Sequence, residues 1–135
     1  MGNRKRWARV EDIEAWLDCE KAIYYTGGDK HWLRDGLKWQ RLIGPDDSDD
    51  LIFGIGKLDP GQIHLLHHHE DAPELYFVLD GRGKFTVDGE VVEGTPGTGI
   101  YIPTGSKHRI VNDGQGTLVF FFAYPQPHFK TTLDE

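Results

Sequence analysis

Residues 61–81, GQIHLLHHHEDAPELYFVLDG, hold the pattern that decides the fold. Three consecutive histidines are followed at a short distance by Glu74 and an apolar run. Successive side chains of a strand point to opposite faces, so His67 and His69 share one face and His68 points to the other. Imidazole nitrogens and a carboxylate are suitable ligands for a first-row divalent metal. Glu74 must reach the two histidines from a neighbouring strand or a turn.

A second stretch, residues 97–112, reads GTGIYIPTGSKHRIVN and supplies one more ligand candidate. A strand predicted up to Ile102 ends at Pro103, a Thr-Gly turn follows, and His108 opens the next strand. By alternation alone, His64 falls with His68 on the face away from the ligands, and both are interpreted as non-ligands. A β-bulge would change this alternation.

The two stretches together resemble the motifs of the cupin superfamily, in particular its small single-domain, metal-binding members. The first motif has a glycine, a His-x-His pair, a glutamate and a closing glycine, and the second has a glycine, Pro-x-Gly, a histidine and an asparagine. Every fixed position is matched, and the matching residues are Gly61, His67, His69, Glu74, Gly81, Gly97, Pro103, Gly105, His108 and Asn112. The strand pattern extends the likeness to residues 37–124.

The resemblance implies an all-β fold, the cupin double-stranded β-helix or jelly-roll barrel, with the metal inside its mouth. It implies one divalent transition metal held by His67, His69, Glu74 and His108. Fe(II) or Mn(II) is favoured, and Zn(II), Ni(II) and Cu(II) also fit these ligands. Some family members have a ligand-binding barrel without a metal.

The pattern of apolar residues predicts the same architecture independently. Short strands between turn signals are typical of antiparallel barrels, and they are expected at 37–43, 51–58, 74–79, 84–87, 90–93, 99–102 and 117–124. Apolar residues at helical spacing predict one N-terminal helix over 10–24. The expected organisation is an N-terminal helical segment (1–30), a cupin barrel (31–125) and a C-terminal tail (126–135). Gly54 and Gly56 either weaken their strand or allow a close approach.

Composition limits the class of partner. A chain of 135 residues with 38% hydrophobic residues is long enough for one globular domain. A net charge of −7 argues against a nucleic-acid partner, whose phosphates are bound mainly by Lys and Arg. No apolar run of membrane-spanning length and no signal-peptide pattern is seen, so a membrane partner is not expected and a cytoplasmic location is. The single cysteine, Cys19, is interpreted as a small residue of the predicted helix rather than a reactive thiol.

Tyr76 lies two residues after Glu74 and should share its face. It is either a packed aromatic or a general base, because a nearby cation favours the deprotonated phenol. The segments ELYFVLDGRG and LVFFFAYPQPHF are similar to small cupins that include dimethylsulfoniopropionate lyases, in which a tyrosine at this position abstracts a proton from carbon. This resemblance implies Tyr76 as a catalytic residue, and Tyr101 or Tyr124 as candidates for a second tyrosine.

Residues proposed to line a substrate pocket are Trp39, Arg41, Tyr101 and Phe122. Arg41 is either a rim residue or an anchor for a substrate carboxylate. The expected function is a metal-dependent enzyme acting on a small polar carboxylate or enol-type substrate by lyase, isomerase or dioxygenase chemistry. The alternative is a non-catalytic metal- or small-molecule-binding module. Apolar residues on both faces of 74–79 and 117–124 predict a homodimer.

Overall fold

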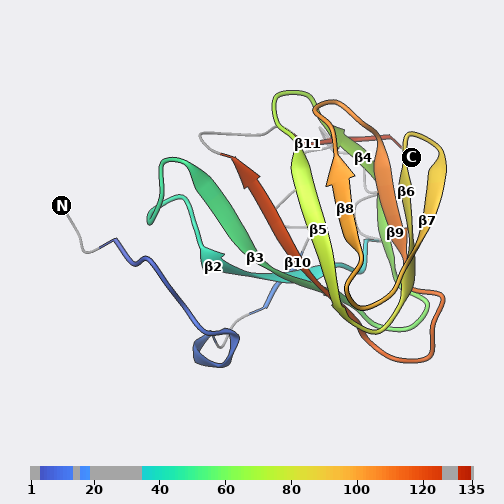
Figure 1. Ribbon diagram of the computed structural model, residues 1–135, viewed down its shortest axis with the longest axis horizontal. Coiled ribbons are helices and arrows are strands. Elements are labelled where there is room, and N and C mark those ends of the chain that lie inside the picture. Colours follow the sequence, from blue (N-terminus) through green and yellow to red (C-terminus); the bar gives the residue numbers. More distant parts are fainter. Residues whose placement is uncertain (1–3, 14–15, 19–34, 126–130, 135) are drawn as a thin grey trace.

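A computed structural model describes residues 4–13, 16–18, 35–125 and 131–134. Two antiparallel sheets face each other and enclose the core (Figure 1). The six-stranded sheet contains β1 (Leu17–Asp18), β2 (Lys38–Ile43), β3 (Leu51–Leu58), β10 (Leu118–Pro125), β5 (Glu74–Asp80) and β8 (Gly99–Ile102), in that spatial order. The five-stranded sheet contains β11 (Thr131–Leu133), β4 (Ile63–His69), β9 (His108–Val111), β6 (Gly83–Val87) and β7 (Glu90–Gly94). The predicted all-β barrel is therefore confirmed.

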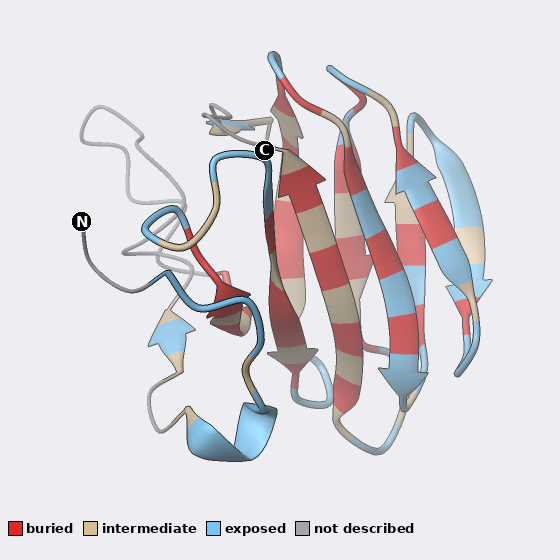
Figure 2. Cartoon of the chain, turned by 60° about the vertical axis from the view of Figure 1, so that its left-hand side comes forward, coloured by how far each residue is buried: buried red, intermediate tan, exposed pale blue. Residues whose placement is uncertain are grey.

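The strands bury alternate side chains, as their sequence pattern requires (Figure 2). On β10 every second residue is buried, from Leu118 to Tyr124. The core cluster draws on both sheets and consists of Leu37, Trp39, Ile52, Leu58, Tyr76, Val78, Phe85, Ile100, Ile102, Ile110, Leu118, Phe120, Phe122 and Tyr124. The core therefore lies between the sheets and fills the interior beside the polar residues of the first motif.

The glycines of β3 allow close approach, which decides between the two readings of their role. A Cβ at Gly56 would clash with the Phe120 ring, and one at Gly54 would clash with the carbonyl of Gln40 and lie 3.0 Å from Phe122 Cζ. Phe120 and Phe122 are the residues directly opposite these glycines on β10. Two large aromatic rings can lie over β3 because it has no side chains at these positions.

Two glycines and one buried asparagine of the motifs stabilise the turns and loops between strands. Gly81 has φ of 74° and Gly105 has φ of 82°, a region that L side chains rarely adopt. The amide of Gly105 donates to the carbonyl of His69 at 2.8 Å, which ties this turn to β4. Asn112 is fully buried, and its Nδ2 donates to the carbonyls of Leu58 and Gly116. The last residue of the second motif is therefore structural.

The predicted N-terminal helix is wrong over the residues that the structure describes. Val10–Asp12 form a single 3-10 turn, and β1 pairs with the edge of β2. The side chain of Gln40 donates to the carbonyl of Ile13 at 2.8 Å, and Lys38 contacts Asp18 at 2.9 Å. These contacts with β2 stabilise extended backbone and override the helical spacing of the apolar side chains. Residues 14–15 and 19–24 of the prediction, with Cys19, lie outside the described part of the chain.

The C-terminal tail contains a strand for which the sequence shows no periodicity. β11 pairs with the ligand end of β4, with Thr131 opposite His69 and Leu133 opposite His67.

No described helix is long and apolar enough to cross a membrane.

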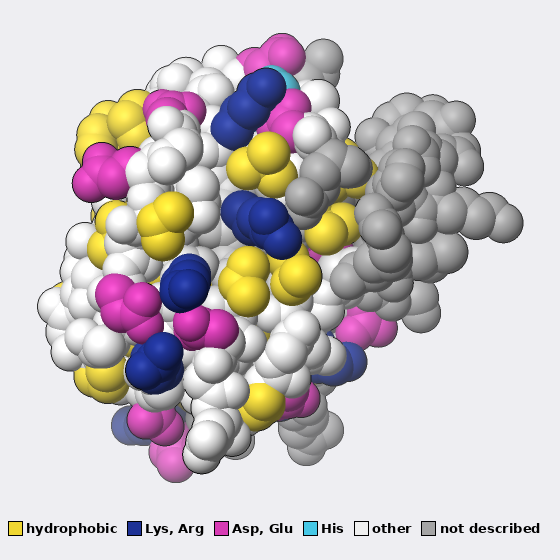
Figure 3. Space-filling view, turned by 90° about the vertical axis from the view of Figure 1, so that its right-hand side faces the viewer, with side chains coloured by type: hydrophobic (Ala, Val, Ile, Leu, Met, Phe, Trp, Pro, Cys, Tyr) yellow, Lys and Arg dark blue, Asp and Glu magenta, His cyan; other side chains and the backbone are white. Residues whose placement is uncertain are grey.

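The outer faces of the two sheets differ in chemistry. Figure 3 shows the side of the molecule on which β7 lies, where Lys and Arg side chains are interspersed with acidic and apolar ones. Arg82 contacts both Glu93 and Asp113, and Lys84 contacts Asp113. On the six-stranded sheet, by contrast, Leu75, Phe77 and Leu79 of β5 are 43%, 42% and 46% exposed.

Candidate metal centre

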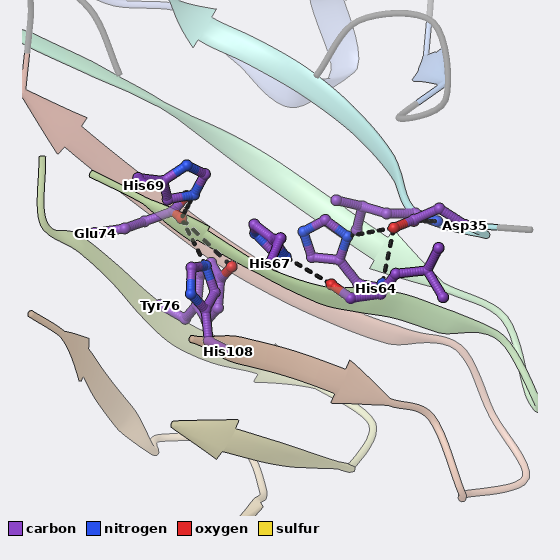
Figure 4. Close-up of polar contacts among 9 residues, drawn as sticks. Asp35, His64, His67, His69, Glu74, Tyr76 and His108 are labelled. Atoms are coloured by element: carbon purple, nitrogen blue, oxygen red, sulfur yellow. Dashed lines mark hydrogen bonds and ion pairs between the residues drawn. The ribbon is translucent and has the colours of Figure 1, made fainter. Parts of the chain in front are cut away.

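Four predicted ligands meet inside the barrel (Figure 4). His67 and His69 come from β4, Glu74 begins β5 and His108 begins β9. One potential ligand atom from each residue lies within 4.8 Å of the others. All four side chains are buried, with exposed fractions from 1% to 8%. This group can hold a metal ion.

Hydrogen bonds fix the orientation of the three imidazoles. The Nδ1 atom of His67 contacts the carbonyl of Leu65 at 2.6 Å, and that of His108 contacts the carbonyl of Ser106 at 2.9 Å. The Nδ1 atom of His69 contacts Thr131 Oγ1 at 3.1 Å. Histidines that bind metals usually hold one ring nitrogen in this way and present the other to the ion. Here the Nε2 atoms of His69 and His108 face Glu74.

Glu74 is the common partner within the cluster. Its Oε1 atom lies 3.2 Å from His69 Nε2, 3.6 Å from His108 Nε2 and 3.5 Å from the Tyr76 hydroxyl. Burial alone would raise the pKa of the Glu74 carboxyl, but the contacts with His108 and His69 outweigh burial and lower the pKa to about 2. Glu74 is thus ionised at neutral pH, as a metal ligand must be.

The remaining donors also suit a cation. Burial, together with the neighbouring histidines, holds the pKa of His67 well below its usual 6.5, so its imidazole is neutral. His108 Nε2 is buried, and at 3.6 Å from Glu74 Oε1 it makes no hydrogen bond among the described residues. A buried polar atom without a partner is destabilising, and coordination to a metal would satisfy it. A donor set of three imidazoles and one carboxylate fits a divalent transition metal.

His64 lies inside the barrel, although alternation places it outside. The pairing of β4 with β9 shifts between His64 and His67, so the bulge reverses the alternation. The His64 ring lies 4.4 Å from that of His67, and its Nδ1 contacts the buried carboxylate of Asp35 at 2.9 Å. Asp35 also accepts from the amide of Leu65 at 2.8 Å. His64 is not among the clustered ligands, but the face predicted for it is wrong.

His68 points away from the cluster, as alternation predicts. Its Nδ1 contacts Asp134 Oδ2 at 2.7 Å, and its Nε2 lies 3.5 Å from Glu70. The hydrogen bond to Asp134 raises the pKa of His68. This histidine therefore links β4 to the C-terminal segment.

Three of the proposed pocket residues lie on the inner face, and one does not. Trp39 and Phe122 pack edge to face with ring centroids 6.0 Å apart, and Arg41 lies over the Trp39 ring. Tyr101 is 69% exposed and pairs with Leu75 on the outer face, so its assignment to the pocket is wrong. Its neighbours Ile100 and Ile102 take the two inward positions of β8. Of the two candidates for a second tyrosine, Tyr124 is the one that is buried in the core between the sheets.

Sequence reasoning missed two partners of the site, Asp35 and Thr131. Asp35 precedes β2 by three positions, and Thr131 lies in a tail without apolar periodicity. Their contacts join residues 29 and 62 positions apart. Nothing in the local sequence signals contacts at these separations.

Comparison with known proteins agrees with the fold and the site. Residues 54–124 match the cupin domain model Cupin_2. Dimethylsulfoniopropionate lyase DddW of Ruegeria pomeroyi is 31% identical over 116 residues, which cover 84% of this chain and 74% of that protein. Glucose-6-phosphate isomerase of Thermococcus litoralis is 35% identical over 135 residues, covering 80% of this chain and 71% of that protein.

Solved structures give the same result at the level of the fold. The structure of KdgF from Halomonas sp. superposes with a TM-score of 0.69 at 20% identity, covering 91% of this chain and 96% of that one. The domain match includes Glu74 and His108 as well as the His-x-His pair. With its barrel, its two motifs and this match, the chain belongs to the cupin domain family.

Proposed function

We propose that this chain is a metal-dependent enzyme that acts on a small polar carboxylate or enol-type substrate by moving a proton, as a lyase or an isomerase. The observation that carries the proposal is the convergence of four ligand atoms within 4.8 Å, beside a buried tyrosine. Perturbed titratable groups gathered inside a barrel are typical of catalytic sites.

His67, His69, Glu74 and His108 would hold the metal, with Fe(II) or Mn(II) favoured. A bound divalent ion would orient a substrate carboxylate and stabilise negative charge that develops beside it. The ionised Glu74 and three imidazoles leave the ligand set with a net charge of about −1, which a divalent ion reverses. The interior would then attract anionic substrates.

Tyr76 is the proposed general base. It is 3% exposed, its ring packs against Phe120 at 4.9 Å and Phe85 at 5.9 Å, and its hydroxyl lies 3.5 Å from Glu74 Oε1. Packing of this kind holds the hydroxyl at one place beside the ligands. A bound cation would favour the phenolate, which can take a proton from carbon.

The similar proteins favour proton transfer over oxygenation. Two relatives are named as a lyase and an isomerase, and neither name denotes a reaction with dioxygen. In a dioxygenase of the same ligand set, Tyr76 would only orient the substrate. The two mechanisms predict different turnover under anaerobic conditions, because only a dioxygenase needs oxygen.

The test begins with elemental analysis of the purified protein, followed by turnover assays with dimethylsulfoniopropionate, glucose 6-phosphate and other small carboxylates. Turnover should persist without oxygen, and Tyr76→Phe should lower it roughly 10²- to 10⁴-fold. Tyr101→Phe, on the outer face, is the matched control and should leave turnover unchanged. Loss of turnover without oxygen, or a Tyr76→Phe effect below about tenfold, would refute the proton-transfer mechanism.

We further propose that a second copy of the chain covers the outer face of the six-stranded sheet. Leu75, Phe77 and Leu79 on β5 form an exposed apolar row there, and Tyr101 on β8 adjoins it. Contiguous exposed apolar surface of this kind marks interaction sites. Sedimentation should find twice the chain mass of 15.4 kDa at micromolar concentration, and Phe77→Glu should return it to the monomer.

A further inference from the structure

Arg41 lies in a row of residues that crosses the inner face of the six-stranded sheet. It stands opposite Gly54 on β3, which stands opposite Phe122 on β10, which stands opposite Tyr76 on β5. Directly opposite residues of neighbouring strands share a face. The guanidinium of Arg41 therefore belongs to the same interior as the proposed base and the metal cluster.

The guanidinium is held in place, yet part of it lacks a partner. Its central carbon lies 4.7 Å from the centroid of the Trp39 ring, a cation–π contact that holds the group against the ring. Its Nε atom is buried and has no hydrogen-bond partner among the described residues. A buried donor in this state is unfavourable until a ligand accepts from it.

Tyr124 connects Arg41 to the cluster. Its ring stacks with that of Phe122, with centroids 6.0 Å apart and planes at 10°. Burial raises the pKa of the Tyr124 hydroxyl, the Arg41 guanidinium opposes this rise through its charge and a hydrogen bond, and the Glu74 carboxylate adds to it. By register Tyr124 also stands beside Glu74, because its neighbour Ala123 pairs with Leu75. The hydroxyl therefore neighbours both the guanidinium and the cluster, and an O–H group there can donate to an anion.

The chemistry of this pair fits a carboxylate better than a phosphate. Among the described residues, Arg41 is the only cationic side chain on the inner face of the six-stranded sheet. Phosphates bind best where several donors or a helix N-terminus meet them, and the described helical element is a three-residue turn at the opposite side of β2. One planar guanidinium and one hydroxyl match the two oxygens of a carboxylate.

We propose that Arg41 and Tyr124 form a carboxylate-binding subsite beside the metal cluster, so that the natural substrate carries two carboxylates. One carboxylate would bind the metal that the cluster holds, and the other would accept from the guanidinium and the Tyr124 hydroxyl, which contact each other without it. This inference rests on the proposed function, since the first carboxylate is placed by a metal. The subsite would also orient the carbon between the two groups toward Tyr76.

The test measures binding by calorimetry with two probes of equal carbon chain, glutarate and pentanoate, on the metal-loaded protein. Glutarate should bind roughly 10- to 100-fold more tightly, because a charge-assisted hydrogen bond contributes this much. Arg41→Met, which keeps length and apolar contact with Trp39, should abolish the preference by weakening glutarate alone. Tyr124→Phe should reduce the preference for glutarate by less than Arg41→Met does.

Arg82→Met is the matched control, because Arg82 pairs with Glu93 and Asp113 on the outside of the barrel. It should leave both affinities unchanged. If Arg41→Met does not fold, Arg41→Lys replaces it, and the preference should fall severalfold because an ammonium cannot make the two-pronged contact. A preference that survives these substitutions, or none in the unaltered protein, overturns the subsite.

Two further outcomes separate this inference from the proposed function. Arg41-dependent binding of glutarate to a protein that holds no metal would support the subsite and reject the metalloenzyme. If pentanoate binds only when metal is present and glutarate binds no more tightly, the metal site is supported and the carboxylate subsite is rejected. Arg41-dependent binding of 4-phosphonobutyrate above that of glutarate would replace the carboxylate class with a phosphate-like one and overturn the proposal.

Discussion

The interior of the barrel has two halves, one apolar and one polar, and the side chains of both are buried. In one half Leu58, Val78, Phe85, Ile110, Leu118 and Phe120 are at most 1% exposed. In the other, His67, His69, Glu74, Tyr76 and His108 are at most 8% exposed. The same strands contribute to both: β5 passes from Glu74 to Val78, and β9 from His108 to Ile110.

The difference shows where stability and function are placed. Burial of the apolar half lowers the free energy of the fold directly. Burial of the polar half is unfavourable unless each group is hydrogen-bonded, and one nitrogen, His108 Nε2, makes no hydrogen bond among the described residues. The apolar half should therefore stabilise the chain without a metal, and the polar half should become markedly more stabilising when a metal binds.

The largest effect is expected in the apolar half. Phe120→Ala removes a ring that packs against Tyr76 and Phe85, and it should lower the free energy of unfolding by about 3–5 kcal/mol. Urea unfolding should give the same loss with and without a chelator. Val91→Ala, at a 60% exposed position, is the control and should change stability by less than about 0.5 kcal/mol. A loss that depends on metal would contradict the division.

The polar half should respond to metal instead. At a free metal concentration of several hundred times Kd, binding should add ~3–4 kcal/mol to the stability of the unaltered protein. His67→Ala should abolish this increment, and His68→Ala, on the outer side of the same strand, should retain it. Thermal melting with and without chelator measures both. An increment that persists in His67→Ala would show that the metal binds elsewhere.

Acid should reveal the charge of Glu74 in the metal-free protein. Its pKa falls from 4.5 to about 2 on folding, so the ionised carboxylate contributes stability that is complete above pH 4.5 and is lost as the pH falls toward 2. The loss across this window should be on the order of 3 kcal/mol. Glu74→Gln should remove this part of the pH dependence in urea titrations. Equal slopes for the two proteins would show that Glu74 has no such shift.

The smallest effect is expected for Asp35, which does not bind the metal and supports a ligand indirectly. Asp35 accepts from the amide of Leu65, whose carbonyl orients His67. Asp35→Asn should therefore weaken metal affinity roughly 10- to 100-fold while the four ligands remain. Competition with a chromogenic chelator measures the Kd, and the Co(II) spectrum reports the ligand geometry. Asp59→Asn, which removes an exposed contact with Thr117, serves as the control; an equal effect there would exclude a specific role for Asp35.

The sequence predicted what depends on local spacing. Glycines with positive φ, such as Gly81 and Gly105, and the alternation of β5 and β10 are local properties from which strands and turns could be predicted. The ligand cluster was implied by the resemblance to the cupin motifs. The register shift in β4 depends on its pairing with β9, and it reversed the face of His64. Tyr101 was misplaced for a related reason: both faces of its strand are apolar or aromatic, and only the pairing with β5 decides which side is inside.

The prediction of an N-terminal helix was wrong because pairing with β2 competes with helix formation. Its apolar spacing is helical, but an unpaired edge of β2 offers backbone hydrogen bonds that local spacing does not reveal. β11 illustrates the same limit, since it gains its order from β4 and contributes no pattern of its own.

The place of β10 in its sheet has a consequence for the order in which the molecule can be assembled during synthesis. β10 lies between β3 and β5, and it pairs Leu118 with Leu58 across most of the domain sequence. A growing chain therefore has both flanking strands before the strand that joins them, and such distant pairings form slowly. His69 obtains its Thr131 partner later still. A nascent chain in which every metal ligand has been synthesised thus still lacks Thr131, so His69 is fully oriented, and metal is bound, only late in maturation.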